Sequence, residues 1–345
     1  MPVTTVDGVM DLLPGDVVDA VVIGGGAAGL GGALMLARLR RSVVVIDSGT
    51  PRNAPAEGVH ALLGLDGTTP AELLRRGREE VRRYGGRIVA GEVTSAAPDV
   101  PSAEGDPRFT ITLSDSRSVQ TRRVLVATGL RDTLPDIPGL APHWGKGVVH
   151  CPFCHGWEVR DEPIGVLAGG PGSILHAQLF RQLTEDIVYF TRGTDLDDGT
   201  RKRFATRGIR VIDTPVAEVR SDETGITGVR LTDGQVVPRR VLTVLTWMQA
   251  RTDGLEGLQL PMADLPGGIG RGFVTGMAGT TDVPGVWVAG NATDLAAQVG
   301  AAAAAGALAA SHMSADLAIA DTNAALVVVQ SHNNPSSFGH EENSR

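Results

Sequence analysis

The clearest pattern in the chain is a short apolar run that leads directly into a glycine cluster, and it occurs twice. The first run is residues 19–23 and the second is residues 164–168, about 145 residues further on (164 − 19). Uninterrupted apolar runs of this length are typical of strands buried in a parallel sheet. An expected helix and a second strand follow each cluster: residues 30–41 and 42–46 after the first, residues 174–184 and 186–190 after the second. Two βαβ units therefore predict the α/β class, with two Rossmann-like, three-layer domains.

Further elements are expected around these two units. Thr69 can cap a helix whose first turn holds Pro70 and whose reciprocal capping position holds Glu72. We expect this helix to stop at Gly85. An alanine-rich helix is predicted at residues 295–310. Strands are predicted at residues 87–97 and 108–114, as a hairpin or meander, and at residues 123–127, 210–213, 227–232, 241–245 and 285–289.

The length and the net charge of the chain limit the classes of protein to which it can belong. A chain of 345 residues corresponds to about two domains. The net charge is 31 − 39 = −8, and no basic run is present, which argues against nucleic acid or an anionic membrane as the main partner. No apolar run reaches the ~18 residues of a membrane span, and residues 1–20 lack the basic start of a secretory signal. We expect a cytoplasmic protein with a polar, disordered tail at residues 331–345.

The first glycine cluster matches the dinucleotide-binding pattern G-x-G-x-x-G. Gly24 allows the tight turn, Gly26 allows the backbone to approach a pyrophosphate, and Gly29 allows the helix to pack closely. The helix N-terminus offers free N–H groups to the phosphates. Asp47, at the end of the second strand, is placed to accept a hydrogen bond from a ribose hydroxyl. The alternative is a purely structural turn, but strand, helix and acidic residue all agree with a dinucleotide site.

The second glycine cluster is degenerate. If it is aligned from Ala168, an alanine replaces the first glycine, and Pro171 removes one N–H from the phosphate cradle. If it is aligned from Gly170, Leu175 stands where close packing needs a small residue. No acidic residue ends the following strand, and Arg192 is followed by Asp195, Asp197 and Asp198. Arg201 or Arg203 could still reach a phosphate, but the pattern makes NADPH an unlikely ligand.

The two cysteines form a single C-x-x-C, Cys151 and Cys154. One such pair in an intracellular chain indicates redox chemistry or half of a metal site. His150 and His155 flank the pair, but neighbours in so tight a loop rarely complete a tetrahedral metal site. A C-x-x-C can lower the pKa of one thiol and let the other resolve a mixed disulfide. His155 is the stronger candidate for moving the protons, with His150 as an alternative, and each could instead be a surface or capping residue.

Together these pieces resemble the low-molecular-weight thioredoxin reductase superfamily of FAD-dependent pyridine-nucleotide-disulfide oxidoreductases. The resemblance runs from about residue 20 to residue 311 and rests on the Gly24 pattern, Ala127-Thr-Gly129, the C-x-x-C, and Gly285-Val-Trp-Val-Ala-Gly-Asn291. It implies a discontinuous FAD-binding domain interrupted by a smaller, degenerate NAD(P)H-binding-like domain that carries the C-x-x-C, and it implies a homodimer. The expected boundaries are residues 1–133 and 248–330 for the FAD domain and residues 134–247 for the insert.

Two departures from the usual reductase sequence indicate a smaller group of enzymes within this superfamily. The usual Cys-Ala-Thr-Cys-Asp loop is here Cys-Pro-Phe-Cys-His, so His155 replaces an acidic proton donor, and the usual Gly-Asp beside the flavin ribityl chain is Gly290-Asn291. With the degenerate second cluster, this combination resembles the thioredoxin reductase-like dithiol oxidases of natural-product pathways, such as those of gliotoxin, holomycin and romidepsin. Such an enzyme oxidises a small-molecule dithiol to a disulfide and passes the electrons through cysteines and FAD to O2, which gives H2O2.

The resemblance also assigns roles to individual residues. Cys154 would lie next to the flavin, Cys151 would face the substrate, and His155 would be the acid and base. The alanine-rich helix would direct its N-terminal dipole at the flavin pyrimidine. The implied FAD contacts are Gly24, Gly26, Ala27, Ala28, Gly29, Asp47, Ser48, Asn53, His60, Val93, Ala127, Thr128, Gly129, Gly290, Asn291, Gln298 and Val299.

Two other functions compete with a dithiol oxidase. One is an NADPH-dependent reductase of thioredoxin or of another disulfide. The other is a non-catalytic flavoprotein that binds a thiol compound or docks to a pathway enzyme. The sequence does not identify the dithiol, and it predicts no metal ion as a cofactor.

Overall fold

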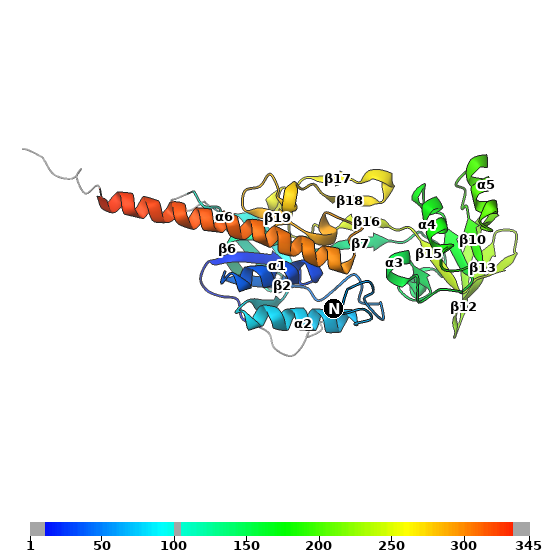
Figure 1. Ribbon diagram of the computed structural model, residues 1–345, viewed down its shortest axis with the longest axis horizontal. Coiled ribbons are helices and arrows are strands. Elements are labelled where there is room, and N and C mark those ends of the chain that lie inside the picture. The colour runs from blue at the N-terminus through cyan, green and yellow to red at the C-terminus, as the bar shows by residue number, and fades with distance from the viewer. Residues whose placement is uncertain (1–10, 100–104, 334–345) are drawn as a thin grey trace, which may run out of the picture.

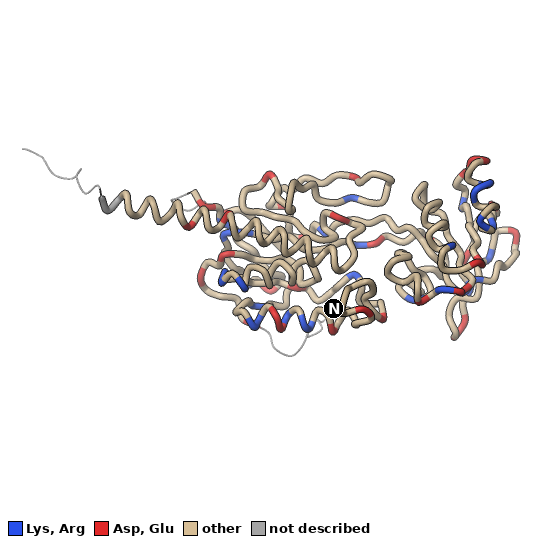
Figure 2. The backbone as a smooth tube through the Cα atoms, viewed as in Figure 1, with Lys and Arg blue, Asp and Glu red and all other residues tan. Residues whose placement is uncertain are grey.

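The computed structural model describes residues 11–99 and 105–333, which form two α/β bodies joined by a narrow pair of strands (Figure 1). One body is built on a seven-stranded sheet and the other on a five-stranded sheet. Acidic and basic residues are interspersed along both bodies (Figure 2). None of the helices in the described ranges combines the length and the apolarity that crossing a bilayer requires.

The larger sheet has the order β3-β2-β1-β6-β5-β4, with β19 beside the second half of β6. Its strands are β1 (Val18–Ile23), β2 (Val43–Asp47), β3 (Arg87–Ala90), β4 (Val93–Pro98), β5 (Phe109–Leu113), β6 (Ser118–Val126) and β19 (Val286–Val288). The strands β3, β2, β1, β6 and β19 run parallel, and β6, β5 and β4 form an antiparallel meander. The parallel part is the first βαβ unit that the sequence predicts.

The single strand expected at residues 87–97 is in fact two strands in different parts of the sheet. β3 pairs with β2, whereas β4 pairs with β5. The chain turns at Gly91, whose N–H donates to the carbonyl of Asp47 (3.0 Å). A Cβ at position 91 would lie 2.5 Å from Cδ2 of Leu113, so any other residue at this turn would require the Leu113 side chain to shift.

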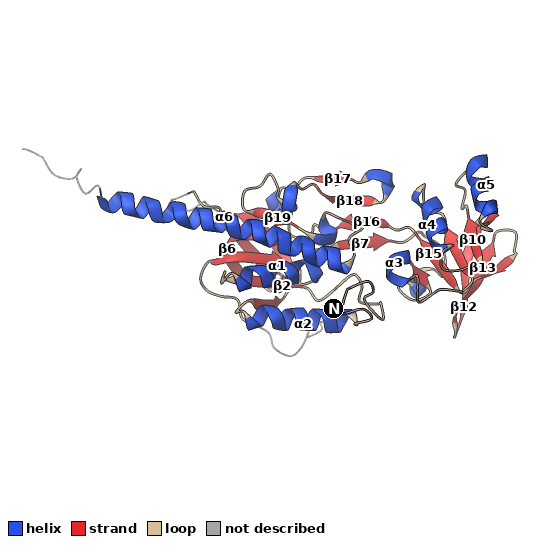
Figure 3. Cartoon of the chain, in the orientation of Figure 1, coloured by secondary structure: helices blue, strands red, loops and turns tan. Residues whose placement is uncertain are grey.

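Three helices cover the larger sheet: α1 (Ala27–Arg38), α2 (Pro70–Arg83) and α6 (Val299–Asn333) (Figure 3). α2 begins as expected, with the Thr69 hydroxyl accepting from the N–H of Glu72 (3.3 Å). α1 and α6 pack backbone to backbone, because a Cβ at Gly31 would lie 2.5 Å from the carbonyl oxygen of Ala303. The small residues of the alanine-rich helix therefore serve a close helix–helix contact.

α6 is much longer than the predicted helix at residues 295–310, and it extends past the sheet (Figure 1). It starts later because turns precede it, with the N–H of Ala297 donating to the carbonyl of Asp294 (3.1 Å), and it continues because no glycine or proline interrupts residues 307–333. The first three residues of the predicted disordered tail, 331–333, are therefore helical. The rest of that tail, residues 334–345, lies outside the described residues.

The second body contains the second predicted βαβ unit. Its parallel strands have the order β11-β10-β9-β15-β8, and an antiparallel three-stranded sheet of β12, β13 and β14 packs beside them. The strands are β8 (Val148–Val149), β9 (Ile164–Leu167), β10 (Ile187–Phe190), β11 (Arg210–Ile212), β12 (Val216–Asp222), β13 (Gly225–Leu231), β14 (Val236–Pro238) and β15 (Val241–Val244). The helices are α3 (Pro152–His155), α4 (Gly172–Phe180) and α5 (Asp198–Thr206).

The two bodies are connected by β7 (Leu130–Thr133) and β16 (Trp247–Ala250), which pair antiparallel. β7 leaves the larger body and β16 returns to it, so the second body is an insertion in the first. β16 continues the pairing to β18 (Gly270–Phe273) and β17 (Met262–Asp264). The short 3₁₀ turns are η1 (Ala141–His143), η2 (Glu256–Leu258), η3 (Pro266–Gly268), η4 (Met277–Gly279) and η5 (Gly290–Ala292).

Candidate active site

A cavity of about 750 Å³ lies between the two bodies and is lined by residues of both. The larger body contributes the loop after β1, the end of β2, the loop 48–60, residues 127–131 and the start of α6. The inserted body contributes residues from Trp144 to His155. A cavity of this size is in the range of cofactor sites.

The loop between β1 and α1 forms a cradle suited to phosphates. Gly24 has φ +108°, a conformation that side chains other than glycine rarely adopt. Gly26 is the N-cap of α1 and provides no side-chain cap, and a Cβ there would meet nothing within 4 Å. The first N–H groups of α1 are thus left for a ligand at the positive end of the helix dipole. Gly29 does not line the cavity; a Cβ there would collide with the carbonyl oxygen of Gly24, so it allows α1 to pack against the loop.

Asp47 lines the cavity at the end of β2. Its carboxylate accepts a hydrogen bond from the N–H of Gly49 (3.2 Å), which fixes its orientation. Gly25 is a position where the G-x-G-x-x-G pattern allows any residue. In the structure, however, a Cβ at this position would lie 2.5 Å from Oδ2 of Asp47. Gly25 therefore allows the carboxylate to lie against the glycine loop, and only the folded structure reveals this contact.

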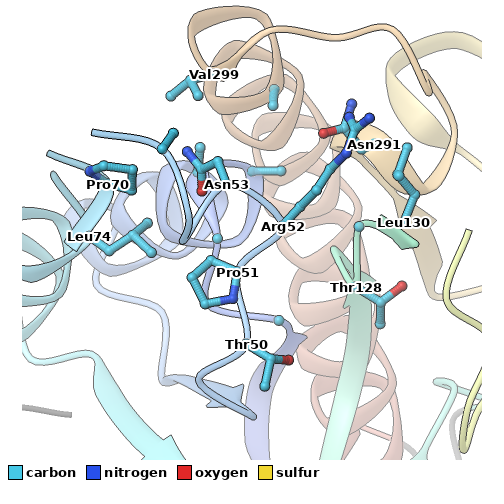
Figure 4. A pocket seen from close by; sticks show the side chains of 18 of the residues that line it. Thr50, Pro51, Arg52, Asn53, Pro70, Leu74, Thr128, Leu130, Asn291 and Val299 are labelled. Atoms are coloured by element: carbon cyan, nitrogen blue, oxygen red, sulfur yellow. The ribbon is translucent and has the colours of Figure 1, made fainter. Parts of the chain in front are cut away.

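The opposite end of the cavity is built around the turn that precedes α6. The side-chain amide of Asn291 donates to the carbonyls of Asp294 and Ala297, both at 2.9 Å. Gly290 has φ +70° and lies behind the cavity wall, where its Cβ would be 2.6 Å from that of Ala28. Figure 4 shows Asn291 and Val299 in the upper part of the view, with Asn53 below Val299.

Arg52 is a cavity residue that the sequence did not single out. Its guanidinium makes a two-pronged ion pair with Asp132 on β7, with N–O distances of 2.6 and 2.7 Å, and Thr246 donates to the same carboxylate at 2.6 Å. Burial disfavours the charged form of Asp132, but Arg52 and Thr246 outweigh burial and hold the pKa of Asp132 below its usual range. The cavity loop is thereby tied to both connecting strands.

Cys151 and Cys154 form a disulfide at the start of α3, and both line the cavity. His155 lies beside them with both ring nitrogens buried and without a hydrogen-bond partner among the described residues. Burial lowers the pKa of His155, so its neutral form is favoured. A neutral imidazole next to a thiol or disulfide can accept a proton.

His150 lies on the other side of Cys151 and is held by the backbone. Its Nδ1 is 3.1 Å from the carbonyl oxygen of Val244, and its own carbonyl is 2.5 Å from Nε2 of His176. Burial lowers the pKa of His150 and lowers that of His176 to about 4. His176 does not line the cavity and supports the C-x-x-C loop from behind.

The structure thus brings nearly all the predicted site residues to one cavity. Of the predicted residues, Gly29 and Gly290 lie behind its wall. Those that line it are Gly24, Gly26, Ala27, Ala28, Asp47, Ser48, Asn53, His60, Val93, Ala127, Thr128, Gly129, Cys151, Cys154, His155, Asn291, Gln298 and Val299.

Several polar groups in and around the second glycine loop, in the inserted body, are bound to the protein itself. The N–H of Gly169 donates to Oγ of Ser173 (2.8 Å), and Arg192 donates to the carbonyl of Ala168 (2.8 Å). Arg201 is paired with Asp213 by two hydrogen bonds of 3.0 Å. The N–H of Gly169 and the guanidinium groups of Arg192 and Arg201 are therefore engaged with the protein itself.

Residues 18–309 match the family model described as "Pyridine nucleotide-disulphide oxidoreductase". The chain belongs to this family. It is accordingly an oxidoreductase by family, and membership implies that it binds FAD. The glycine cradle, the open N-terminus of α1 and the oriented Asp47 fit that cofactor.

Individual relatives agree with the family assignment. The chain is 38% identical over 189 residues to "Thioredoxin reductase tcpT" of Claviceps purpurea, an alignment that covers 52% of this chain and 57% of the relative. It is 32% identical over 231 residues to "Thioredoxin reductase sirT" of Leptosphaeria maculans, covering 63% of this chain and 70% of the relative. The match therefore spans little more than half of the first relative's length.

Solved structures of this family match over most of their length. The crystal structure of HlmI has a TM-score of 0.86 and 40% identity, covering 93% of this chain and 99% of that chain. An oxidoreductase from Agrobacterium tumefaciens has a TM-score of 0.81 and 31% identity, covering 88% and 99%. The two-domain Rossmann fold expected from the sequence is confirmed by these likenesses.

Proposed function

We propose that this oxidoreductase is a flavin-dependent dithiol oxidase that closes a small-molecule dithiol to an intramolecular disulfide, with O2 as the final acceptor. The observation that carries the proposal is that the Cys151–Cys154 disulfide opens into the same cavity as the glycine cradle. In the glycine loop of the insert, in contrast, the N–H of Gly169 and the guanidinium of Arg192 are bound internally.

The residues of the cavity divide into those that would hold FAD and those that would handle thiols. The cradle from Gly24 to Gly29 would hold the pyrophosphate, Asp47 the ribose, and the N-terminus of α6 at Val299 the isoalloxazine. The bound flavin supplies a two-electron acceptor for the cysteine pair and a donor to oxygen.

The cysteines and His155 carry out the exchange with the substrate. A substrate thiolate attacks Cys151 and breaks its bond to Cys154, which leaves as a thiolate. The second substrate thiol then displaces Cys151 and releases the cyclic disulfide. His155, neutral and without another partner, takes the protons that these thiols lose. The sum is one dithiol and one O2 converted to one disulfide and one H2O2.

An NADPH-dependent reductase is the second candidate, and the names of the relatives tcpT and sirT favour it. It requires a nicotinamide site in the inserted body. Pro171 lacks an N–H, and Ser173 occupies the N–H of Gly169 in the loop that would bind the phosphates. These contacts support the oxidase, and they support our expectation that NADPH is not a cofactor.

Oxygen uptake by the purified protein tests the proposal. With dithiothreitol and no nicotinamide, we expect O2 consumption with equimolar H2O2, and we expect Cys151→Ser to retain its flavin but lose this activity. Dithiol-dependent uptake that persists in Cys151→Ser, or uptake that requires NADPH, would refute the oxidase.

We also propose that residues 1–133 and 248–330 form the FAD domain, that residues 134–247 form the insert, and that the protein is a homodimer. The exposed face of α6 supports the dimer. Leu308, Ile319 and Leu326 are 52%, 63% and 54% exposed, and their spacings of 11 and 7 residues place them on one side of the helix. A second copy packed along this side would cover them.

A further inference from the structure

A buried histidine of the insert, His176, contacts the segment that leads into the C-x-x-C. His176 lies on α4 and is 5% exposed. Its Nε2 lies 2.5 Å from the carbonyl oxygen of His150, the residue that precedes Cys151. His176 does not line the cavity and takes no part in the exchange steps proposed above. It therefore reaches the redox loop from behind, through the backbone.

The partners of His176 determine which of its ring nitrogens carries the proton. A carbonyl oxygen only accepts hydrogen bonds, so Nε2 must donate to His150. Nδ1 is then an acceptor, and it lies 3.3 Å from Oγ1 of Thr243, a fully buried residue on β15. Phe180, one turn further along α4, packs nearly perpendicular to the ring at a centroid distance of 5.0 Å. Burial lowers the pKa of His176 to about 4, so near neutral pH the ring is in the neutral form that the Thr243 contact requires.

Residue 150 is also held by β15. Nδ1 of His150 lies 3.1 Å from the carbonyl oxygen of Val244, and Val149 pairs with Thr243 in the sheet. α4 thus binds the carbonyl of His150, and β15 binds its ring. Figure 1 shows α3, α4 and β15 together in the insert. The two contacts fix both the backbone and the side chain of the residue before Cys151.

These contacts matter most when the disulfide is open. In the oxidised protein, the bond to Cys154 itself restrains Cys151. Once a substrate thiolate breaks that bond, the covalent restraint is lost, while the contacts of His150 remain. The mixed disulfide on Cys151 must still be aligned for attack by the second substrate thiol. A misplacement of about 1 Å can cost ~10²-fold in rate.

We infer that His176 is a positioning residue for thiol exchange, which holds Cys151 at the cavity through the carbonyl of His150 while the disulfide is open. The inference rests on the proposed function and adds no redox step to it. His176 keeps its Nε2 proton throughout the cycle, since that proton is the one it donates to the carbonyl. Its effect is therefore on the rate of exchange and not on the binding of the dithiol.

The test compares His176→Met with His176→Gln, two side chains of similar length. The amide of Gln can donate to the His150 carbonyl, whereas Met has no donor. With dithiothreitol, His176→Met is expected to lower kcat roughly 10- to 100-fold at an unchanged KM, and His176→Gln should recover most of that rate. The pH–rate profiles should keep the wild-type shape, because His176 transfers no proton. Tyr189→Phe, which removes a buried hydroxyl from β10 of the same domain, is the control and should behave as wild type.

Thr243→Val is a second variant, of nearly unchanged shape, for the case in which His176→Met does not fold. It removes the hydroxyl that donates to Nδ1 and should lower kcat roughly 5-fold, as expected for one neutral hydrogen bond. A wild-type kcat in His176→Met or in Thr243→Val would overturn the inference, and so would a His176→Gln protein as slow as His176→Met. If wild type itself takes up no O2 with dithiothreitol, the proposed function fails instead.

Discussion

Gly25→Ala is expected to weaken FAD binding without unfolding the protein. The added Cβ would lie 2.5 Å from Oδ2 of Asp47, whereas ordinary contact begins at 3.4 Å, so the carboxylate must move by 3.4 − 2.5 = 0.9 Å. A displacement of this size would break the hydrogen bond that we propose the FAD ribose donates to Asp47. A hydrogen bond to a charged group contributes about 1.5–3 kcal/mol, which corresponds to a roughly 10- to 150-fold increase in Kd.

The assay is a titration of deflavinated protein with FAD, followed by quenching of flavin fluorescence. Asp47→Ala should give a loss of the same size, because it removes the same acceptor. Gly15→Ala is the matched control, since a Cβ there would meet no atom within 4 Å. If Gly25→Ala binds FAD within 2-fold of wild type while Asp47→Ala does not, the carboxylate is not held by the glycine loop. If both bind normally, Asp47 does not contact the cofactor.

Two further predictions concern stability and assembly. Asp132→Asn leaves Arg52 without its carboxylate partner and should lower the free energy of unfolding by about 3 kcal/mol, as for a broken buried ion pair. Because the folded-state pKa of Asp132 is lowered, its stabilising effect is complete above the unfolded value of about 3.9 and is lost as the pH falls from there through the folded-state pKa. The difference in melting temperature between the two proteins should therefore shrink as the pH falls below about 3.9, and a difference that stays constant in acid would contradict this. Leu326→Glu, on the exposed face of α6, should convert a dimer to a monomer in light scattering, and a dimer of unchanged stability would exclude this face.

Much of the site could be predicted because its signals are local in sequence. The run from Gly24 to Gly29 has a fixed relation to the strand before it and the helix after it, and Asp47 follows one βαβ unit later. Cys151 and Cys154 are three residues apart, so their pairing needs no knowledge of the fold. The length of α6, in contrast, was not predicted: the expected helix ended at residue 310, although no glycine or proline follows before residue 333.

The long-range polar contacts could not be predicted, because they join residues that only the folded chain brings together. Arg52 and Asp132 are 80 residues apart, and His60 and Glu158 are 98 residues apart (158 − 60). Neither pair belongs to a local motif, and charged residues are common enough in any chain that their presence does not indicate which of them pair. The prediction of one strand at residues 87–97 was wrong for a related reason. The alternation of apolar and polar residues does not reveal where the chain leaves one neighbouring strand and pairs with another.

In the proposed reaction, electrons enter this oxidoreductase from thiols and not from a nicotinamide. An anaerobic titration of the flavin absorbance, with NADPH and NADH added before a dithiol, distinguishes the two sources of electrons. We predict that the flavin band near its visible maximum stays unchanged with either nicotinamide and bleaches with dithiothreitol, and that air restores it. Rapid, stoichiometric bleaching by NADPH would contradict the claim.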